Sequence, residues 1–196
     1  MTDLLLATTN PGKQREYRLL LEGLPGRIVT PGEIGLDLQV EEPYDTYAEN
    51  ATTKAEAYCA ASGLLTLADD SGLEVAALDW GPGVHTAYYG GSQVTDKVGH
   101  LLAETDGATD RRARMVCVIA IGIPNATGPR VELFRGEMEG TLALQRYGEG
   151  GFGYDPVFLL PSGVTTAQLP EAEKNQISHR GRAAAAARPR LIELLS

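Results

Sequence analysis

The sequence predicts a single α/β domain, and three observations carry that expectation. Short apolar runs typical of buried strands alternate with longer segments of helical periodicity. The chain has 196 residues, of which 43% are hydrophobic, so one domain can bury a sizeable core. No internal repeat or composition shift marks a linker. We therefore expect one unit over residues 1–196, built around a mixed sheet.

The first half of the chain is expected to alternate strands and helices. An Asn-Pro-Gly turn follows the first apolar run, and Ser62-Gly63 ends an alanine-rich segment in the manner usual for a helix C-terminus. In chain order, we expect a strand at 4–7, a loop at 8–12, a helix over 13–21, a strand near 28–29, an irregular acidic stretch to 45 and a helix over 46–61.

The second half adds strands that pair through turns. A Pro- and Gly-containing cluster at 124–129 separates two β-leaning runs, which predicts a hairpin. Pro189 is expected to kink the last helix. In chain order, we expect a strand at 64–68, a glycine-bracketed loop at 81–91, a helix over 93–104, strands at 113–123 and 130–137, a glycine-rich loop at 148–156, a strand at 157–160 and a helix over about 178–195.

Charge and composition narrow the class of partner. The net charge of −9 argues against a nucleic-acid polymer, because phosphate-backbone binding needs a basic surface. The N-terminus has no basic region, and no apolar stretch approaches transmembrane length, which predicts a cytoplasmic protein without a membrane partner. Cys59 and Cys117 lie in helical and strand patterns, so we expect two core residues.

Two adjacent carboxylates, Asp69 and Asp70, close the apolar run at 64–68. A buried strand there would deliver them to the edge of the sheet, where α/β proteins usually hold ligands. Two acids at such an edge suit a metal site or acid/base chemistry. The alternative is ordinary turn chemistry, since Asp-Ser-Gly is also a common bend.

A second candidate site is the loop Thr8-Thr9-Asn10-Pro11-Gly12-Lys13, between a strand and a helix start. Hydroxyls, backbone amides and one ammonium would meet there at the positive end of the helix, which is a common way to bind phosphate. The Walker A spacing is absent. A plain turn with a solvated Lys13 is the alternative.

Further charged residues fit a metal-bound phosphate. Glu41 or Glu42 with Asp70 could supply the one or two carboxylates that a hard divalent ion needs when phosphates and waters complete its shell. Glu49 and Lys54 are five residues apart and do not share a helix face well, so an ion pair between them is not expected. An exposed acidic loop is the alternative for the glutamate pair.

The C-terminal third offers groups for a base. Phe152-Gly153-Tyr154-Asp155 combines aromatic faces, a glycine that permits close approach and one carboxylate. The alternative is a tight turn with core aromatics. Lys174 and the pair His179-Arg180 place positive groups near a helix N-terminus, which the helix dipole disfavours, so a functional reason is favoured. We expect Lys174, with Lys13 and Lys54, to hold the charge of the phosphates.

Taken together, these motifs resemble those of the inosine triphosphate pyrophosphatase family, which includes bacterial dITP/XTP pyrophosphatases. The resemblance runs nearly end to end. The matching segments are Ala7 to Lys13, Glu49-Asn50-Ala51 with Lys54-Ala55, Ala68 to Leu73, Pro82-Gly83, Gly151 to Pro156, Glu173-Lys174 and Ile177 to Arg180.

The resemblance implies an elongated α/β fold of two lobes around a long mixed sheet, with the nucleotide in the cleft, and a homodimer. Asp70 would accept a proton and, with Glu41 or Glu42, bind Mg²⁺. The expected substrate contacts are Thr8, Thr9, Asn10, Pro11, Gly12, Lys13, Lys54, Ser71, Phe152, Gly153, Tyr154, Asp155, Lys174, His179 and Arg180.

The chain departs from the family pattern at Tyr88, where many bacterial relatives have arginine. Arg111, Arg112 or Arg114 could substitute for that arginine.

The function expected is hydrolysis of ITP, dITP and XTP to monophosphate and pyrophosphate, which removes non-standard purines from the nucleotide pool. Lysines, a metal and helix ends with no covalent nucleophile suit this chemistry, which consists mostly of positioning and charge stabilisation. Two alternatives stay open. One is a non-catalytic module that senses a purine nucleotide, and the other is a septum-inhibition-type nucleotide pyrophosphatase that acts on modified pyrimidines or standard nucleotides.

Overall fold

A computed structural model describes residues 2–196. Its elements are β1 Asp3–Leu6, α1 Pro11–Leu20, β2 Arg27–Val29, α2 Tyr47–Ser62, β3 Leu65–Val75, β4 Gly81–Pro82, α3 Lys97–Glu104, β5 Arg112–Ile123, β6 Arg130–Leu142, β7 Phe158–Leu159, α4 Glu171–Ile177 and α5 His179–Leu195. The strand order is β2-β1-β3-β5-β6-β7, with β4 paired to β3. The strand β1 runs parallel to β2 and β3, whereas the β3–β4 and β6–β7 pairs are antiparallel, so the predicted mixed sheet is confirmed.

The chain divides into two compact units. The first unit contains residues up to Asp70 together with Cys117–Gly136 and Arg180–Ser196. The second unit contains Ser71–Val116 and Glu137–His179. No helix of the described residues is long and apolar enough to cross a membrane.

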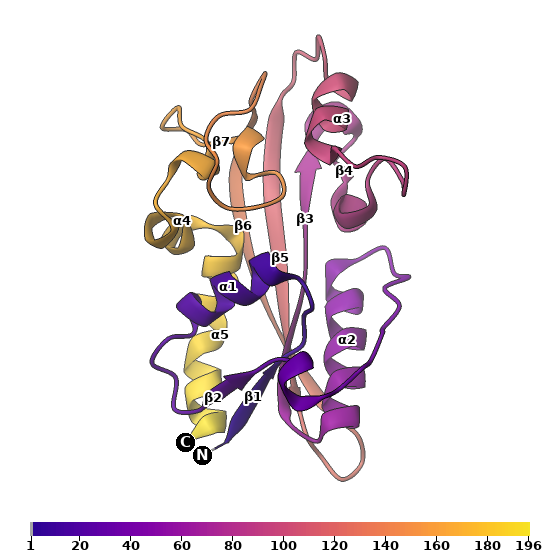
Figure 1. Ribbon diagram of the computed structural model, residues 1–196, viewed down its shortest axis with the longest axis vertical. Helices are drawn as coiled ribbons and strands as arrows, with labels where there is room; N and C mark the ends of the chain where they lie inside the picture. The colour runs from indigo at the N-terminus through magenta and orange to yellow at the C-terminus, as the bar shows by residue number, and fades with distance from the viewer. Residues whose placement is uncertain (1) are drawn as a thin grey trace. The chain divides into compact units, whose positions relative to one another are not determined.

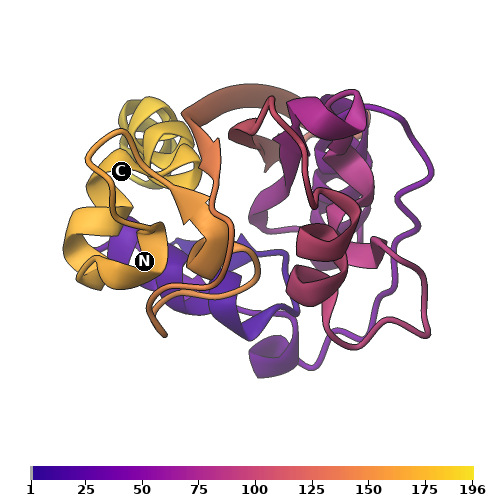
Figure 2. The ribbon, with the colours of Figure 1, turned by 90° about the horizontal axis from the view of Figure 1, so that it is seen from above.

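The first unit places helices on both faces of its strands. Tyr17 of α1 and Leu191 of α5 pack with Leu67 of β3 in one buried cluster, so α1 and α5 cover the same face. Figure 1 shows α2 on the other side of β1 and β3, and the view in Figure 2 also separates α2 from α5. Both faces of β3 are therefore buried, as its near-continuous burial requires.

The two helices that lead toward Asp69 and Asp70 begin at polar caps. Asn10 Oδ1 accepts hydrogen bonds from the amides of Gly12 and Lys13, at 2.9 and 3.2 Å, and Pro11 occupies the first turn of α1. Thr46 Oγ1 caps α2 by accepting from the amide of Glu49 at 3.2 Å. The first turns of α1 and α2 are thus both closed by side-chain caps.

The second unit has its own apolar cluster. Leu73 and Val75 of β3 contribute to it with Leu101 of α3, Met115 of β5 and Phe158 of β7. Side chains from α4 and from the segments around β7 border this cluster. The unit is thus stabilised independently of the core formed around α1 and α5.

Several sequence-based boundaries are corrected. The strand β3 continues to Val75, because the apolar pattern resumes at Leu73, so Asp69 and Asp70 lie inside a strand rather than at its end or in a turn. The helix α3 begins only at Lys97, where Asp96 caps it, instead of at residue 93. The short helix α4 was not predicted, and β6 extends five residues beyond the expected end.

Gly122 tests how tightly α2 packs on the sheet. A Cβ at this position would lie 2.8 Å from the carbonyl oxygen of Ala55 and 3.0 Å from Cys59 Cβ. We predict that Gly122→Ala lowers the free energy of unfolding by about 1–3 kcal/mol, the usual cost of overpacking. Urea denaturation measures the change. The control is Gly32→Ala, where an added Cβ meets nothing within 4 Å; equal stability of the two variants would contradict close packing of α2.

Candidate active site

Asp69 lies at the centre of a buried cluster of charges in the first unit. Its residue is 1% exposed, and Lys13 Nζ of α1 approaches its Oδ2 to 2.9 Å. Arg180 Nε of α5 lies 3.7 Å from the same oxygen. Burial opposes ionisation of Asp69, but the positive charges of Lys13, Arg180 and Lys54 outweigh it and hold its pKa well below the usual range. Asp69 is therefore a fixed anion.

Arg180 is held from a second side by Glu16. Its Nη1 donates to Glu16 Oε2 at 2.6 Å, and both side chains are almost completely buried. The guanidinium also lies over the ring of Tyr17, 5.8 Å from its centroid. Glu16, Arg180, Asp69 and Lys13 thus form a chain of alternating charges from α1 through α5 and β3 back to α1. Such buried charges are tolerated only when they are paired in this way.

Asp70 has a different environment, because successive residues of a strand face opposite sides of the sheet. Asp69 meets Lys13 and Arg180 on one side, whereas Asp70 Oδ2 accepts a hydrogen bond from Asn50 Nδ2 of α2 at 3.2 Å. Burial raises the pKa of Asp70, with Lys13, Lys54 and Asn50 acting in the opposite direction. A carboxylate whose pKa lies above its ordinary value is a better proton acceptor at neutral pH.

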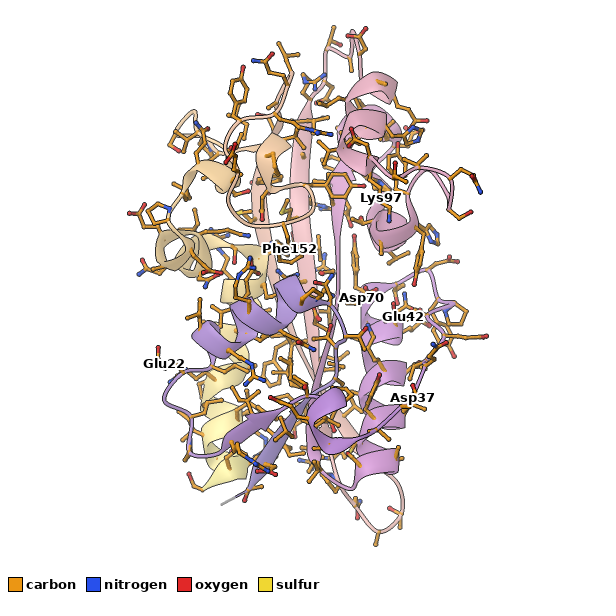
Figure 3. All side chains as sticks on the ribbon, in the orientation of Figure 1. Glu22, Asp37, Glu42, Asp70, Lys97 and Phe152 are labelled. Atoms are coloured by element: carbon orange, nitrogen blue, oxygen red, sulfur yellow. The ribbon has the colours of Figure 1, made fainter. Side chains whose placement is uncertain are left out.

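Lys54 of α2 contacts both the acidic segment that precedes this helix and strand β3. Its Nζ donates to the carbonyl oxygen of Asp69 at 3.0 Å and forms an ion pair with Glu42. Burial lowers the pKa of Lys54, and the nearby charge of Lys13 lowers it further. Glu41 is exposed, whereas Glu42 is partly buried. Figure 3 shows Glu42 and Asp70 near the same end of α2.

The donor set fits a divalent ion that keeps most of its shell for phosphate and water. No group of three or more His, Cys, Asp or Glu side chains suited to a metal occurs among residues 2–196, so the protein has no complete metal cage there. Two carboxylates, Glu42 and Asp70, lie at one end of α2, and Mg²⁺ commonly uses one or two. Lys54 already provides a positive charge beside Glu42.

The loop before α1 adds neutral donors next to Lys13. Thr8 Oγ1 accepts from the amide of Asn10 at 3.2 Å, and Thr9 is exposed. Gln14 Nε2 donates to the carbonyl of Thr8 at 2.8 Å, which fixes the loop on the helix. The structure therefore holds Lys13 at the helix start, where its ammonium is paired with Asp69.

In the second unit, Asp155 organises the aromatic loop. Its Oδ2 accepts a hydrogen bond from the amide of Phe152 at 2.8 Å and pairs with Lys174, and both Asp155 and Lys174 are buried. Lys174 Nζ lies 5.3 Å from the centroid of the Phe152 ring. Gly151 has φ +70, and a Cβ there would collide with the Asp155 carboxylate. Tyr154 is buried in the apolar cluster.

Two further expected substrate contacts, Ser71 and His179, lie at element positions outside the aromatic loop. Ser71 follows Asp70 in β3, and His179 is buried at the first residue of α5; both belong to the second unit.

Tyr88 is 72% exposed. Arg111 donates to the backbone carbonyls of Thr105, Leu142 and Ala143, which makes it a structural residue rather than a substitute for the missing arginine. Arg112 pairs with Asp110, and Arg114 pairs with Glu74.

Sequence reasoning missed Glu16 and gave Asn50 no role. Glu16 lies three residues after Lys13, so the two share a helix face, and this spacing is the signal that could have found it. Asn50 Oδ1 accepts a hydrogen bond from the Tyr44 amide, and Asn50 Nδ2 donates to the Tyr44 carbonyl, both at 3.0 Å. No local sequence pattern indicates this pair of hydrogen bonds.

Comparison with known proteins agrees with this geometry. A sequence model of the Ham1 family matches residues 4–190. The chain belongs to the Ham1 family. The dITP/XTP pyrophosphatase of Symbiobacterium thermophilum is 48% identical over 197 residues, covering 98% of this chain and 96% of the relative. That of Methylococcus capsulatus is 44% identical over 197 residues, covering 97% and 96%.

Solved structures of the Ham1 family share the fold. A HAM1 protein from Coxiella burnetii is similar with a TM-score of 0.87 and 38% identity, covering 98% of this chain and 100% of that chain. The resemblance that the sequence motifs predict is therefore confirmed, as is the mixed α/β class.

Asp69→Asn should destabilise this Ham1 protein, because buried Arg180 and partly buried Lys13 would both lose the charge of Asp69. We predict a loss of about 3–5 kcal/mol in the free energy of unfolding at neutral pH. Since the pKa of Asp69 is lowered by folding, its contribution exists above the unfolded pKa of about 3.9 and is lost as the pH falls through and below that value. Urea denaturation at neutral and acidic pH measures both effects.

The matched control is Asp70→Asn. The raised pKa of Asp70 means that its ionised form costs stability at neutral pH, so the amide should leave stability unchanged or increase it. Equal losses in the two variants would show that the neighbouring carboxylates do not have opposite roles.

Proposed function

We propose that this chain hydrolyses the non-standard purine nucleoside triphosphates ITP, dITP and XTP to the monophosphate and pyrophosphate. The observation that carries the proposal is the contrast between two adjacent carboxylates. Asp69 is held as an anion by Lys13 and Arg180, whereas the pKa of Asp70 is raised. The family relatives named dITP/XTP pyrophosphatase support the same reaction and substrate class.

Glu42 and Asp70 are the residues that would hold Mg²⁺. Glu42 is preferred to Glu41 because Glu42 is partly buried and paired with Lys54, whereas Glu41 is exposed. When bound, the ion supplies positive charge to the phosphate oxygens. The remaining phosphate charge is assigned to Lys13 and Lys54, with the positive end of α1 and the hydroxyls of Thr8 and Thr9 beside them.

Asp70 acts as the general base in this proposal. One proton of a water passes to the Asp70 carboxylate as the water oxygen forms a bond to the α-phosphorus. The bond between the α-phosphorus and the oxygen that bridges to the β-phosphorus breaks, and pyrophosphate leaves with that oxygen. Lys13 stabilises the charge on the phosphates, and its position is fixed by Asp69.

The loop at 148–156 is assigned to the purine. Phe152 offers a ring for stacking, and Gly153 leaves backbone exposed beside it. Lys174 of α4 pairs with Asp155 of this loop. We therefore assign Lys174 to the purine rather than to the phosphates that the sequence predicts for it. His179 and Ser71 remain predicted contacts. Arg180 acts mainly on Asp69 and Glu16, so its expected contact with the nucleotide also remains a prediction. The homodimer implied by the resemblance is part of the proposal.

Asp70→Asn should lower the rate of ITP hydrolysis by about 10²–10⁴-fold, the usual contribution of a general base. The amide keeps the shape of the side chain but cannot accept the proton from water. Steady-state kinetics with Mg²⁺ measures the change, and circular dichroism checks that the variant is folded. Turnover close to that of the original protein would remove Asp70 from the mechanism.

The function itself is tested by supplying ITP, dITP, XTP, ATP, GTP and TTP with Mg²⁺ and separating the products. Monophosphate and pyrophosphate should form, with ITP, dITP and XTP turned over faster than ATP by about 10⁴-fold, because adenine lacks the O6 acceptor and N1–H donor of hypoxanthine. Rejection of GTP depends on excluding its 2-amine and should be weaker. Orthophosphate as the first product would refute the split, and comparable kcat/KM for ITP and ATP would favour a broader pyrophosphatase. Binding without any product would favour the sensor.

A further inference from the structure

The carboxylate of Asp155 receives a hydrogen bond from a residue outside the aromatic loop. Thr166 Oγ1 lies 2.8 Å from Asp155 Oδ1 and 3.1 Å from the Asp155 carbonyl oxygen. Thr166 is completely buried. A hydroxyl has one proton to donate, and Asp155 Oδ1 is both the nearer and the charged oxygen. We therefore take Oδ1 as the acceptor of the Thr166 hydrogen bond. The other carboxylate oxygen is taken by the Phe152 amide and Lys174.

The segment that carries Thr166 also holds the glycine-rich loop. The amide of Gly150 donates to the carbonyl of Ala167 at 3.0 Å. A Cβ at Gly148 or Gly150 would lie 2.7 Å from that carbonyl oxygen, so the two backbones are in close contact. Thr165 Oγ1 donates to the carbonyl of Tyr147 at 2.6 Å. The short 3₁₀ turn Thr166–Gln168 and Thr165 before it thus hold residues 147–155 in place through these contacts.

We propose that Thr166 is a positioning residue for purine selectivity. Its hydroxyl fixes one oxygen of Asp155, and Asp155 fixes the Phe152 amide and Lys174 through the other oxygen. The orientation of the Phe152 loop, and with it the exclusion of a purine 2-amine, depends on this bond. The inference rests on the proposed function, because the loop is assigned there to the purine.

The hydroxyl, rather than the volume of Thr166, carries this role. A valine of nearly the same shape would leave Asp155 Oδ1 buried without that donor, and a buried carboxylate oxygen that loses a donor can regain one only by moving toward water or another donor. Either movement shifts the carboxylate that holds the Phe152 amide. Serine retains the donor and loses only a methyl group.

The experiment compares Thr166→Val and Thr166→Ser with the original protein. For Thr166→Val we expect the ITP:GTP ratio of kcat/KM to fall about tenfold, equivalent to the loss of one charge-assisted hydrogen bond. The change should be mainly a lower KM for GTP, with kcat for ITP within about a factor of two, since Asp70 and Lys13 belong to the other unit. Thr166→Ser should restore the ratio to within about twofold.

A readout independent of catalysis accompanies the kinetics. The Phe152 amide donates to Asp155, so its hydrogen exchange in the nucleotide-free protein should accelerate in Thr166→Val and not in Thr166→Ser. Thr105→Val is the matched control, because Thr105 is also a buried threonine of the second unit and its hydroxyl bonds only within the end of its own helix. It should lower stability without changing the ITP:GTP ratio. If Thr166→Val does not fold, Thr166→Ala carries the same expectations.

The outcomes separate this inference from the proposed function. An original protein that does not hydrolyse ITP would overturn both. An active original protein with an unchanged ITP:GTP ratio in Thr166→Val would overturn only the role of Thr166. A change that Thr166→Ser fails to restore, or that Thr105→Val reproduces, would show a general loss of packing and would also overturn it.

Discussion

The ion pairs of Asp69 are the interaction on which the first unit depends. This one carboxylate connects Lys13 of α1, Arg180 of α5 and its own strand β3, while Arg180 reaches back to Glu16 of α1. Elements that are far apart in the sequence therefore meet at one buried charge. Because leaving any of these charges unpaired would be costly, the start of α1 and Lys13 have a defined position.

The alternation of a β-strand explains how two identical neighbours acquire different chemistry. Asp69 faces two cations on the side of α1 and α5, and Asp70 faces Asn50 on the side of α2. The former has a lowered pKa because of those cations, and the latter a raised pKa because of burial. The pair thus provides an anchor and a proton acceptor on residues whose Cα atoms are about 3.8 Å apart.

The sequence predicted the order of most elements and most of the candidate residues, because turns, caps and apolar runs are local signals. The start of α1 at Asn10-Pro11 and the end of α2 at Gly63 are examples. It could not predict that β3 continues past Asp70, since polar residues inside a strand become acceptable only when cations from α1, α2 and α5 surround them. The burial of Arg180 against Glu16 and the bond from Thr166 to Asp155 are tertiary contacts that no local pattern indicates.

Two neighbouring carboxylates of β3 have different roles, Asp69 as a fixed anion and Asp70 as a proton acceptor. Carbon-13 NMR titration of the aspartate carboxyl groups, assigned with Asp69→Asn and Asp70→Asn, measures this most directly. We expect the pKa of Asp69 to lie below the ordinary value of about 3.9 and that of Asp70 to lie above it. The reverse order, or two pKa values at the ordinary value, would contradict it.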